Sequence, residues 1–301
     1  MILDRHVWPR NRAVCAGLLA FALIVADLVR PAFGDGQLAT LREDVRTANP
    51  GDPSPPASSD SSEHGSRRSA SEPGSVTEED LSFGALLVGG MVVGGAVTSP
   101  LWVPHKLLDD DFSIGRSFAQ FPYDNVPGSM TIEGLTNTKS WGAQLSTDYA
   151  TGFDDLKSVG GHLIFSTASR FGADLSARDF QERLSTGQHD WLWLGDANLV
   201  FCFARNETMQ WRTGLGINWL DDAHRTDVGF NFTYGFDWFP RKPWVVSTEI
   251  DWGNLGRSGL FHFRSTAGVM VNRFEAYTGY EYYDFDRVHT NALIAGVRVW
   301  F

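Results

Sequence analysis

The sequence lacks the features of a disulfide-rich, zinc-binding or nucleic-acid-binding protein. It contains only two cysteines in 301 residues, Cys15 and Cys202, which are too few for a disulfide framework, and no Cys/His spacing of the zinc type. Basic residues form no block beyond Arg67 and Arg68, and the net charge is −11, so no basic stripe is present to neutralise phosphates. We therefore expect no metal, no cofactor and no nucleic-acid partner.

The chain also lacks an apolar run long enough to cross a bilayer as a helix. Its two apolar runs, residues 13–26 and 83–97, are shorter than the roughly 20 residues that a membrane-spanning helix needs. The first run follows three arginines and precedes the small-residue sequence Ala32 to Gly34, which is the pattern of a cleavable secretory signal. We predict a signal peptide over residues 1–34, with an uncleaved anchor as the alternative.

Aromatic residues, in contrast, are abundant at 13%, and from Ser140 onward they alternate with polar residues. In residues 227–238 every even position is large and apolar or aromatic, whereas the odd positions hold Gly, Asn, Thr or Asp. Ten segments of this kind can be marked between residues 140 and 301. Such alternation predicts half-buried strands.

The polar face decides between a soluble barrel and a membrane barrel. Soluble sheets place Lys and Glu on the outer face, but here the polar positions are Gly, Asn, Thr, Ser and isolated charges of both signs, without Lys. That composition suits a filled interior, and the aromatic face then meets lipid. We predict an all-β fold over residues 140–301, a transmembrane antiparallel up-and-down β-barrel of about ten strands, with eight strands from Phe171 as the alternative.

The predicted interior positions carry charges of both signs on neighbouring strands. Because unpaired charges in a low-dielectric lumen cost much free energy, Arg212 should pair with acids of its flanking strands, and so should Arg264. We predict a plug of paired charges, with an ion path as the alternative; parity also places Cys202 and Trp300 inward. The predicted lumen charge network comprises Arg178, Arg212, Arg264, Arg298, Asp196, Asp227, Asp237, Glu249, Asp251, Glu275 and Glu281.

The last segment carries a recognisable pattern. Apolar residues occupy every second position up to a terminal phenylalanine, at Leu293, Ala295, Val297, Val299 and Phe301. This resembles the last-strand assembly signal of bacterial outer-membrane β-barrels, of the small OmpA or opacity-protein type. The resemblance covers residues 140–301. It implies an outer-membrane location, with outer-membrane lipid and the barrel assembly machinery as partners.

The region before the barrel has a different composition. Residues 35–80 have no hydrophobic periodicity and are rich in Ser and Pro from Pro50, so we predict a disordered linker in the periplasm. Residues 81–139 begin with the Gly-rich apolar run 83–97 and continue as an irregular periplasmic region. For that run we favour packing near the barrel mouth, with a membrane-inserted helix or an apolar linker as alternatives.

Catalysis would require His with an acid or Ser at the outer rim. Three His residues fall beside acids in predicted outer loops, but none matches a known motif; they are His189 with Asp190, His224 with Asp221 and Asp222, and His289 with Asp286. We therefore predict no catalytic residues and a non-enzymatic structural or surface-interaction role. A pore is the second hypothesis, and a rim-sited hydrolase or acyl-modifying enzyme is the third.

Overall fold

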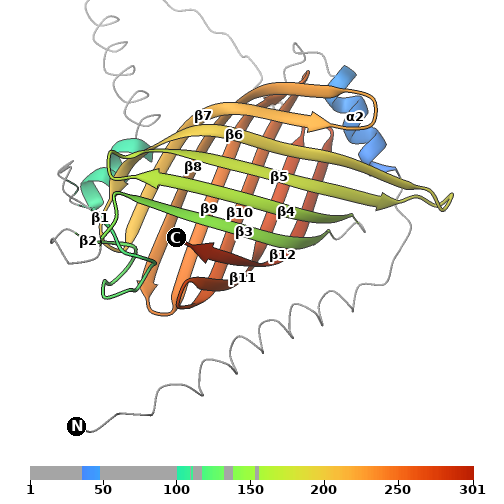
Figure 1. Cartoon of the computed structure of the whole chain (residues 1–301). Helices are drawn as coiled ribbons and strands as arrows, with labels where there is room; N and C mark the ends of the chain where they lie inside the picture. Colours follow the sequence, from blue (N-terminus) through green and yellow to red (C-terminus); the bar gives the residue numbers. More distant parts are fainter. Residues whose placement is uncertain (1–35, 48–99, 109, 111–116, 132–137, 153–155) are drawn as a thin grey trace, which may run out of the picture.

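The computed structural model describes residues 36–47, 100–108, 110, 117–131, 138–152 and 156–301. Ten antiparallel strands form a closed barrel in which each strand pairs with its sequence neighbours and β12 pairs with β3 (Figure 1). The ten-strand prediction is confirmed, and the eight-strand alternative is wrong because β3 and β4 are full members. The strands are β3 (Trp141–Gly152), β4 (Lys157–Thr167), β5 (Phe171–Arg183), β6 (His189–Arg205), β7 (Met209–Asp221), β8 (Thr226–Arg241), β9 (Trp244–Leu255), β10 (Ser258–Val271), β11 (Phe274–Phe285) and β12 (Val288–Trp300).

The two ends of the barrel differ in what they carry. At one end, which we call the turn end, β3 begins and β12 finishes, and the connections are residues 168–170, 206–208, 242–243 and 272–273. The opposite end, which we call the loop end, carries the connections after β3, β5, β7, β9 and β11. These positions agree with the connections that the alternation pattern predicts.

The barrel is polar inside and apolar outside. Large apolar side chains on the outer wall are exposed, up to 68% for Leu199 and Trp252, whereas inward-facing charged residues are buried. Glycines give the interior charges room: a Cβ at Gly160 would lie 2.6 Å from Arg178 Nη2, and one at Gly268 would lie 2.2 Å from Glu275 Oε1. The predicted assignment of the two faces is confirmed.

A helix covers the loop end. Helix α2 (Gln37–Thr47) lies across this mouth of the barrel (Figure 1). Its apolar residues Leu38, Leu41 and Val45 recur at helical spacing and share one buried face. The prediction that residues 35–80 are a disordered linker is therefore wrong for residues 37–47, which form α2. The amphipathic stretch is only eleven residues long and lies directly before the Ser/Pro-rich sequence, so its periodicity is weak when residues 35–80 are considered as one segment.

A second segment covers the turn end. Residues 117–131 contain the two-stranded sheet of β1 (Ser117–Phe118) and β2 (Met130–Thr131). Between these strands, Tyr123 joins a buried cluster with Phe239, Val245, Met270 and Trp300, and its hydroxyl donates to Trp244 O at 2.5 Å. Both mouths of the barrel are thus capped by residues that precede it in sequence.

A short helix over residues 100–107 lies beside the outer wall, where Tyr234 Oη donates to Pro100 O at 2.6 Å. Among the described residues, no helix has the length and apolar character needed to cross a bilayer. The predicted signal peptide and the Gly-rich run 83–97 lie outside the described residues.

Candidate functional site: the capped and charged lumen

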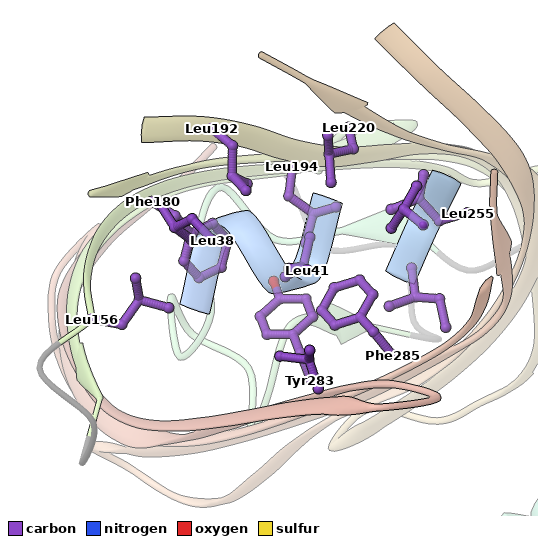
Figure 2. Packing of buried hydrophobic residues seen from close by; sticks show 13 residues of the cluster. Leu38, Leu41, Leu156, Phe180, Leu192, Leu194, Leu220, Leu255, Tyr283 and Phe285 are labelled. Carbon is purple, nitrogen blue, oxygen red and sulfur yellow. The ribbon is translucent and has the colours of Figure 1, made fainter. Parts of the chain in front are cut away.

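The apolar face of α2 packs into the mouth of the barrel. Leu38, Leu41 and Val45 are at most 4% exposed and belong to one cluster with barrel residues (Figure 2). The barrel contributes side chains from the loop-end halves of its strands and from one connection: Leu156, Phe180, Leu192, Leu194, Leu220, Leu255, Leu260, Tyr283, Phe285 and Val288. Burying one large apolar side chain contributes roughly 1.5–3 kcal/mol, so this apolar contact supplies much of the free energy that docks the helix.

The N-terminus of α2 is capped by a barrel carboxylate. Glu182, at the loop end of β5, accepts the backbone amides of Gly36 and Gln37 on Oε1 and that of Leu38 on Oε2, each at 3.0 Å. These amides have no partner within the helix, and the positive end of the helix dipole favours an anion there. Glu182 therefore fixes both the position and the direction of α2.

Two arginines of α2 bind acids of the barrel rim. Arg42 pairs with both oxygens of Asp190 at 2.6 Å, and its Nε lies 2.7 Å from Asp222 Oδ2. Arg46 lies 3.1 Å from Asp222 Oδ2 and 2.9 Å from Asp227 Oδ2. These three acids are held on two neighbouring hairpins, so the arginines tie the helix to both.

Asp222 is the centre of this contact. Although burial by itself raises the pKa of Asp222, hydrogen bonds from the amides of His224 and Arg225 and from Arg46 lower it to about 2. The carboxylate therefore stays charged well below neutral pH, and so does its attraction to α2.

Below the helix, a first charge cluster fills the lumen. Arg178 Nη2 lies 2.6 Å from Asp148 Oδ1 and 3.1 Å from Glu281 Oε1. Arg264 bridges the same two acids, at 2.5 Å and 3.3 Å, so two guanidinium groups share two carboxylates. Tyr277 donates to Asp148 Oδ2 at 2.9 Å. Such mutual pairing offsets the cost of burying these charges.

A second cluster lies around Arg212. Its three nitrogens reach Asp174, Asp237 and Glu249, with N···O distances of 3.4, 2.9 and 2.7 Å. Asp174 and Glu249 also approach the ring of His162, at 2.5 Å and 3.8 Å. One guanidinium group therefore organises three carboxylates from three strands.

A third pair lies toward the turn end. Arg298 Nη1 is 3.3 Å from Glu275 Oε2, and the indole of Trp300 donates to the same oxygen at 2.8 Å. Trp300 and Cys202 are both buried and face inward, as parity predicts. Most of the predicted network is thus assembled in the lumen. Arg212 pairs with Asp237 of its flanking strand β8, as predicted, whereas several other partners differ from the predicted ones.

Arg264 pairs with Glu281 of the flanking strand β11, as predicted for an acid of a neighbouring strand, but it pairs with none of the other flanking-strand acids Glu249, Asp251 and Glu275. Glu249 pairs with Arg212, Asp251 with His262, and Glu275 with Arg298. The prediction considered only ion pairs between adjacent strands. Long side chains also cross the narrow lumen and reach strands that are not adjacent. Arg264 reaches Asp148 in this way, from β10 to β3.

Two predicted members of the network are not paired as predicted. Asp227 lies at the loop-end rim, where it binds Arg46 and Arg225 instead of Arg212. Asp196 contacts no arginine in the part of the chain that the structure describes; Ser176 and Asn198 donate to it.

The predicted charge network leaves out four inward-facing groups that take part in it: Asp148, His162, His262 and Tyr277. His262 lies 2.8 Å from Asp251 Oδ2 and 3.3 Å from Glu281 Oε1, so it links two acids. Position parity marks all four as inward, and that signal could have found them. The histidines are neutral in a simple charge count, which is why they were left out.

Several acids beside the rim histidines have structural partners. Asp190 and Asp222, which were candidates, are held by the arginines of α2. His289 Nδ1 lies 3.1 Å from Asp284, whereas Asp286 instead accepts hydrogen bonds from Ser258 and the Gly259 amide. The acids at this rim therefore hold the helix and the turns.

The predicted assembly residues follow the outer wall of β12. Leu293 and Val297 are exposed, Val299 is half-buried, and Phe301 follows the strand with its backbone paired to Ala143. Their side-chain alternation is thus confirmed, whereas their role in assembly stays a prediction.

A closed ring of strands with apolar side chains outside and paired charges inside is stable only in an apolar surround. The fold is that of a transmembrane β-barrel. No protein-family model matches the sequence, and no curated protein matches it either.

Several solved transmembrane barrels resemble this one at low identity. A de novo designed transmembrane β-barrel is 7% identical over 53% of this chain and 95% of its own, with a TM-score of 0.27. Ail, an outer-membrane protein of Yersinia pestis, is 12% identical over 53% of this chain and 99% of its own, with a TM-score of 0.30. The KdgM porin is 8% identical over 53% of this chain and 99% of its own, with a TM-score of 0.24.

Proposed function

We propose that this protein is an integral outer-membrane β-barrel with a closed lumen, which serves a structural or surface-interaction role in the cell envelope. The observation that carries the proposal is the docking of α2 across the loop end above a lumen of paired charges. A membrane pore would need a continuous water path, and here both the mouth and the interior are occupied by side chains.

The hollows inside the barrel agree with a non-conducting state. One hollow at the turn end, beside Phe118, Gln144 and Trp300, has a volume of about 40 Å³, and a deeper one beside His162 and Glu249 has about 10 Å³. The deeper hollow corresponds to roughly one water molecule. Volumes of this size hold single waters or ions but do not form a channel.

The test is conductance of the full chain in planar bilayers. We expect no steady conductance from the unmodified protein. Two variants serve as the matched comparison. Leu41→Asp should undock α2, because the docked helix would bury an unpaired charge. Glu43→Asp, at an exposed position of the same helix, should leave the docking of α2 unchanged. A stable conducting step in the unmodified protein would contradict the proposal and favour a pore. A cell fractionation in which the chain is absent from the outer membrane would contradict the location.

A further inference from the structure

Three potential metal ligands converge inside the barrel from three strands. His162 on β4 places Nε2 2.5 Å from Asp174 Oδ1 on β5 and 3.8 Å from Glu249 Oε1 on β9. The ligand atoms of the three residues all lie within 4.8 Å of one another, and all three residues are buried. An imidazole nitrogen with carboxylate oxygens is a donor set that binds divalent transition metals.

Arg212 holds the two carboxylates by their other oxygens. Its Nε lies 3.4 Å from Asp174 Oδ2, and its Nη2 lies 2.7 Å from Glu249 Oε2. The oxygens nearest to His162 are Oδ1 and Oε1, which Arg212 does not engage. This division resembles the outer contacts that orient metal ligands in known sites, because it fixes each carboxylate while leaving one oxygen for an ion.

The other buried lumen histidine shows why this arrangement is specific. At His262, Asp251 approaches Nδ1 at 2.8 Å and Glu281 approaches Nε2 at 3.3 Å. The two carboxylates lie on opposite sides of the ring and cannot bind one ion together with it. At His162, both carboxylates approach the same nitrogen.

The interior between the two caps has an excess of negative charge. Its described carboxylates exceed its arginines by four, so the two histidines leave a net negative charge even when both are protonated. A divalent cation bound at His162 would reduce this excess. The carboxylates are Asp148, Asp174, Asp196, Asp237, Glu249, Asp251, Glu275 and Glu281, and the arginines are Arg178, Arg212, Arg264 and Arg298.

A small hollow lies beside the three residues. A hollow of about 10 Å³ is lined by His162, Glu249 and Arg212. The larger hollow at the turn end, about 40 Å³, shares Gln144, Arg212 and Asp237 with it. The larger hollow at the turn end therefore borders the hollow that His162 and Glu249 line.

We propose that His162, Asp174 and Glu249 form a binding site for one divalent transition-metal ion, with Zn²⁺ as the probe. Zinc bonds to N and O of about 2.0–2.2 Å place neighbouring ligand atoms about 3.0–3.5 Å apart, so His162 and Asp174 must separate slightly and Glu249 must approach. This departs from the expectation of no metal site, because the ligands come from three separate strands and share no sequence spacing. It is independent of the proposed envelope role.

The experiment measures Zn²⁺ bound by the folded full chain in detergent, by equilibrium dialysis and elemental analysis. We expect one tightly bound Zn²⁺ per chain. His162→Gln and Asp174→Asn should each weaken this binding on the order of 100-fold or more, because each removes a ligand. His262→Gln is the matched control, since it alters an equally buried histidine without touching the ligands, and it should retain the ion.

Folding of every variant is checked by its heat-modifiable mobility on gels. X-ray absorption of the Zn²⁺-loaded unmodified protein gives a readout that does not depend on any variant: we expect N/O ligands with a single imidazole. Absence of tight binding in the unmodified protein would overturn the proposal. So would two or more imidazoles, which would indicate exposed histidines, or equal affinity in His162→Gln and the unmodified protein.

Discussion

Substitution of Leu41 by Ala tests whether α2 is held by the barrel in the way the structure shows. Leu41 is 4% exposed and lies in the centre of the cluster that joins the helix to the barrel (Figure 2). Removing a buried leucine side chain costs about 2–5 kcal/mol, and we take about 3 kcal/mol for this site. The eleven residues of α2 are shorter than the ~12–15 that an isolated helix needs. Undocking therefore also unfolds the helix, and its opening equilibrium should rise on the order of 100-fold.

Hydrogen exchange of the α2 amides, followed by mass spectrometry, measures this opening directly. The unmodified helix should be protected, and Leu41→Ala should lose about 3 kcal/mol of that protection. Glu43→Ala is the control, because Glu43 is exposed and because Glu and Ala both favour helices. The protection of the α2 amides should therefore change by less than about 0.5 kcal/mol. The reasoning is refuted if α2 exchanges like a free peptide in the unmodified protein, or if Leu41→Ala and Glu43→Ala exchange alike.

Three further predictions concern the lumen, the outer wall and the rim. Arg264→Ala should destabilise the barrel by about 3–5 kcal/mol in urea unfolding, because it leaves part of the charge of Asp148 and Glu281 unpaired; a cost near that of a surface substitution would contradict the pairing. Phe232→Arg should cost about 2–4 kcal/mol if this outer-wall position lies near the bilayer midplane, with Phe232→Leu nearly neutral, and equal effects of the two would refute the assignment of faces. The lowered pKa of Asp222 contributes docking stability that is present above its ordinary pKa and is lost as the pH falls through about 2, so protection of α2 should decline in that range; protection that is independent of pH there would exclude Asp222 as an anchor.

Local patterns in the sequence are enough to predict the barrel. Period-2 alternation fixes which side chains share a face, and turn residues fix where each strand ends, because both are local properties of the chain. Strand number, strand boundaries and the inward positions of Arg212, Arg264 and Trp300 could all be predicted in this way. The polarity of the inner face then indicated the membrane, since Arg and acids without Lys suit a filled lumen.

Which charges meet depends on how the closed barrel brings distant strands together. Alternation places Asp148 and Arg264 on the inner face, but the closure of the ring brings β3 and β10 within reach of one another across the lumen. Likewise, the ligand atoms of His162, Asp174 and Glu249 converge only because three strands curve around the same small hollow. Distances across a closed ring depend on its diameter and on side-chain length, and neither is written in the sequence spacing.

The docking of α2 was also beyond local sequence reasoning. Its three apolar residues form a helix too short to be stable alone, so the signal is weak in residues 37–47 taken by themselves. The helix is held by residues that are far away in sequence. Glu182 on β5 accepts three backbone amides at its N-terminus, and acids of the rim bind its two arginines. The position of such a segment depends on the surface to which it binds, and that surface is formed only when the barrel closes.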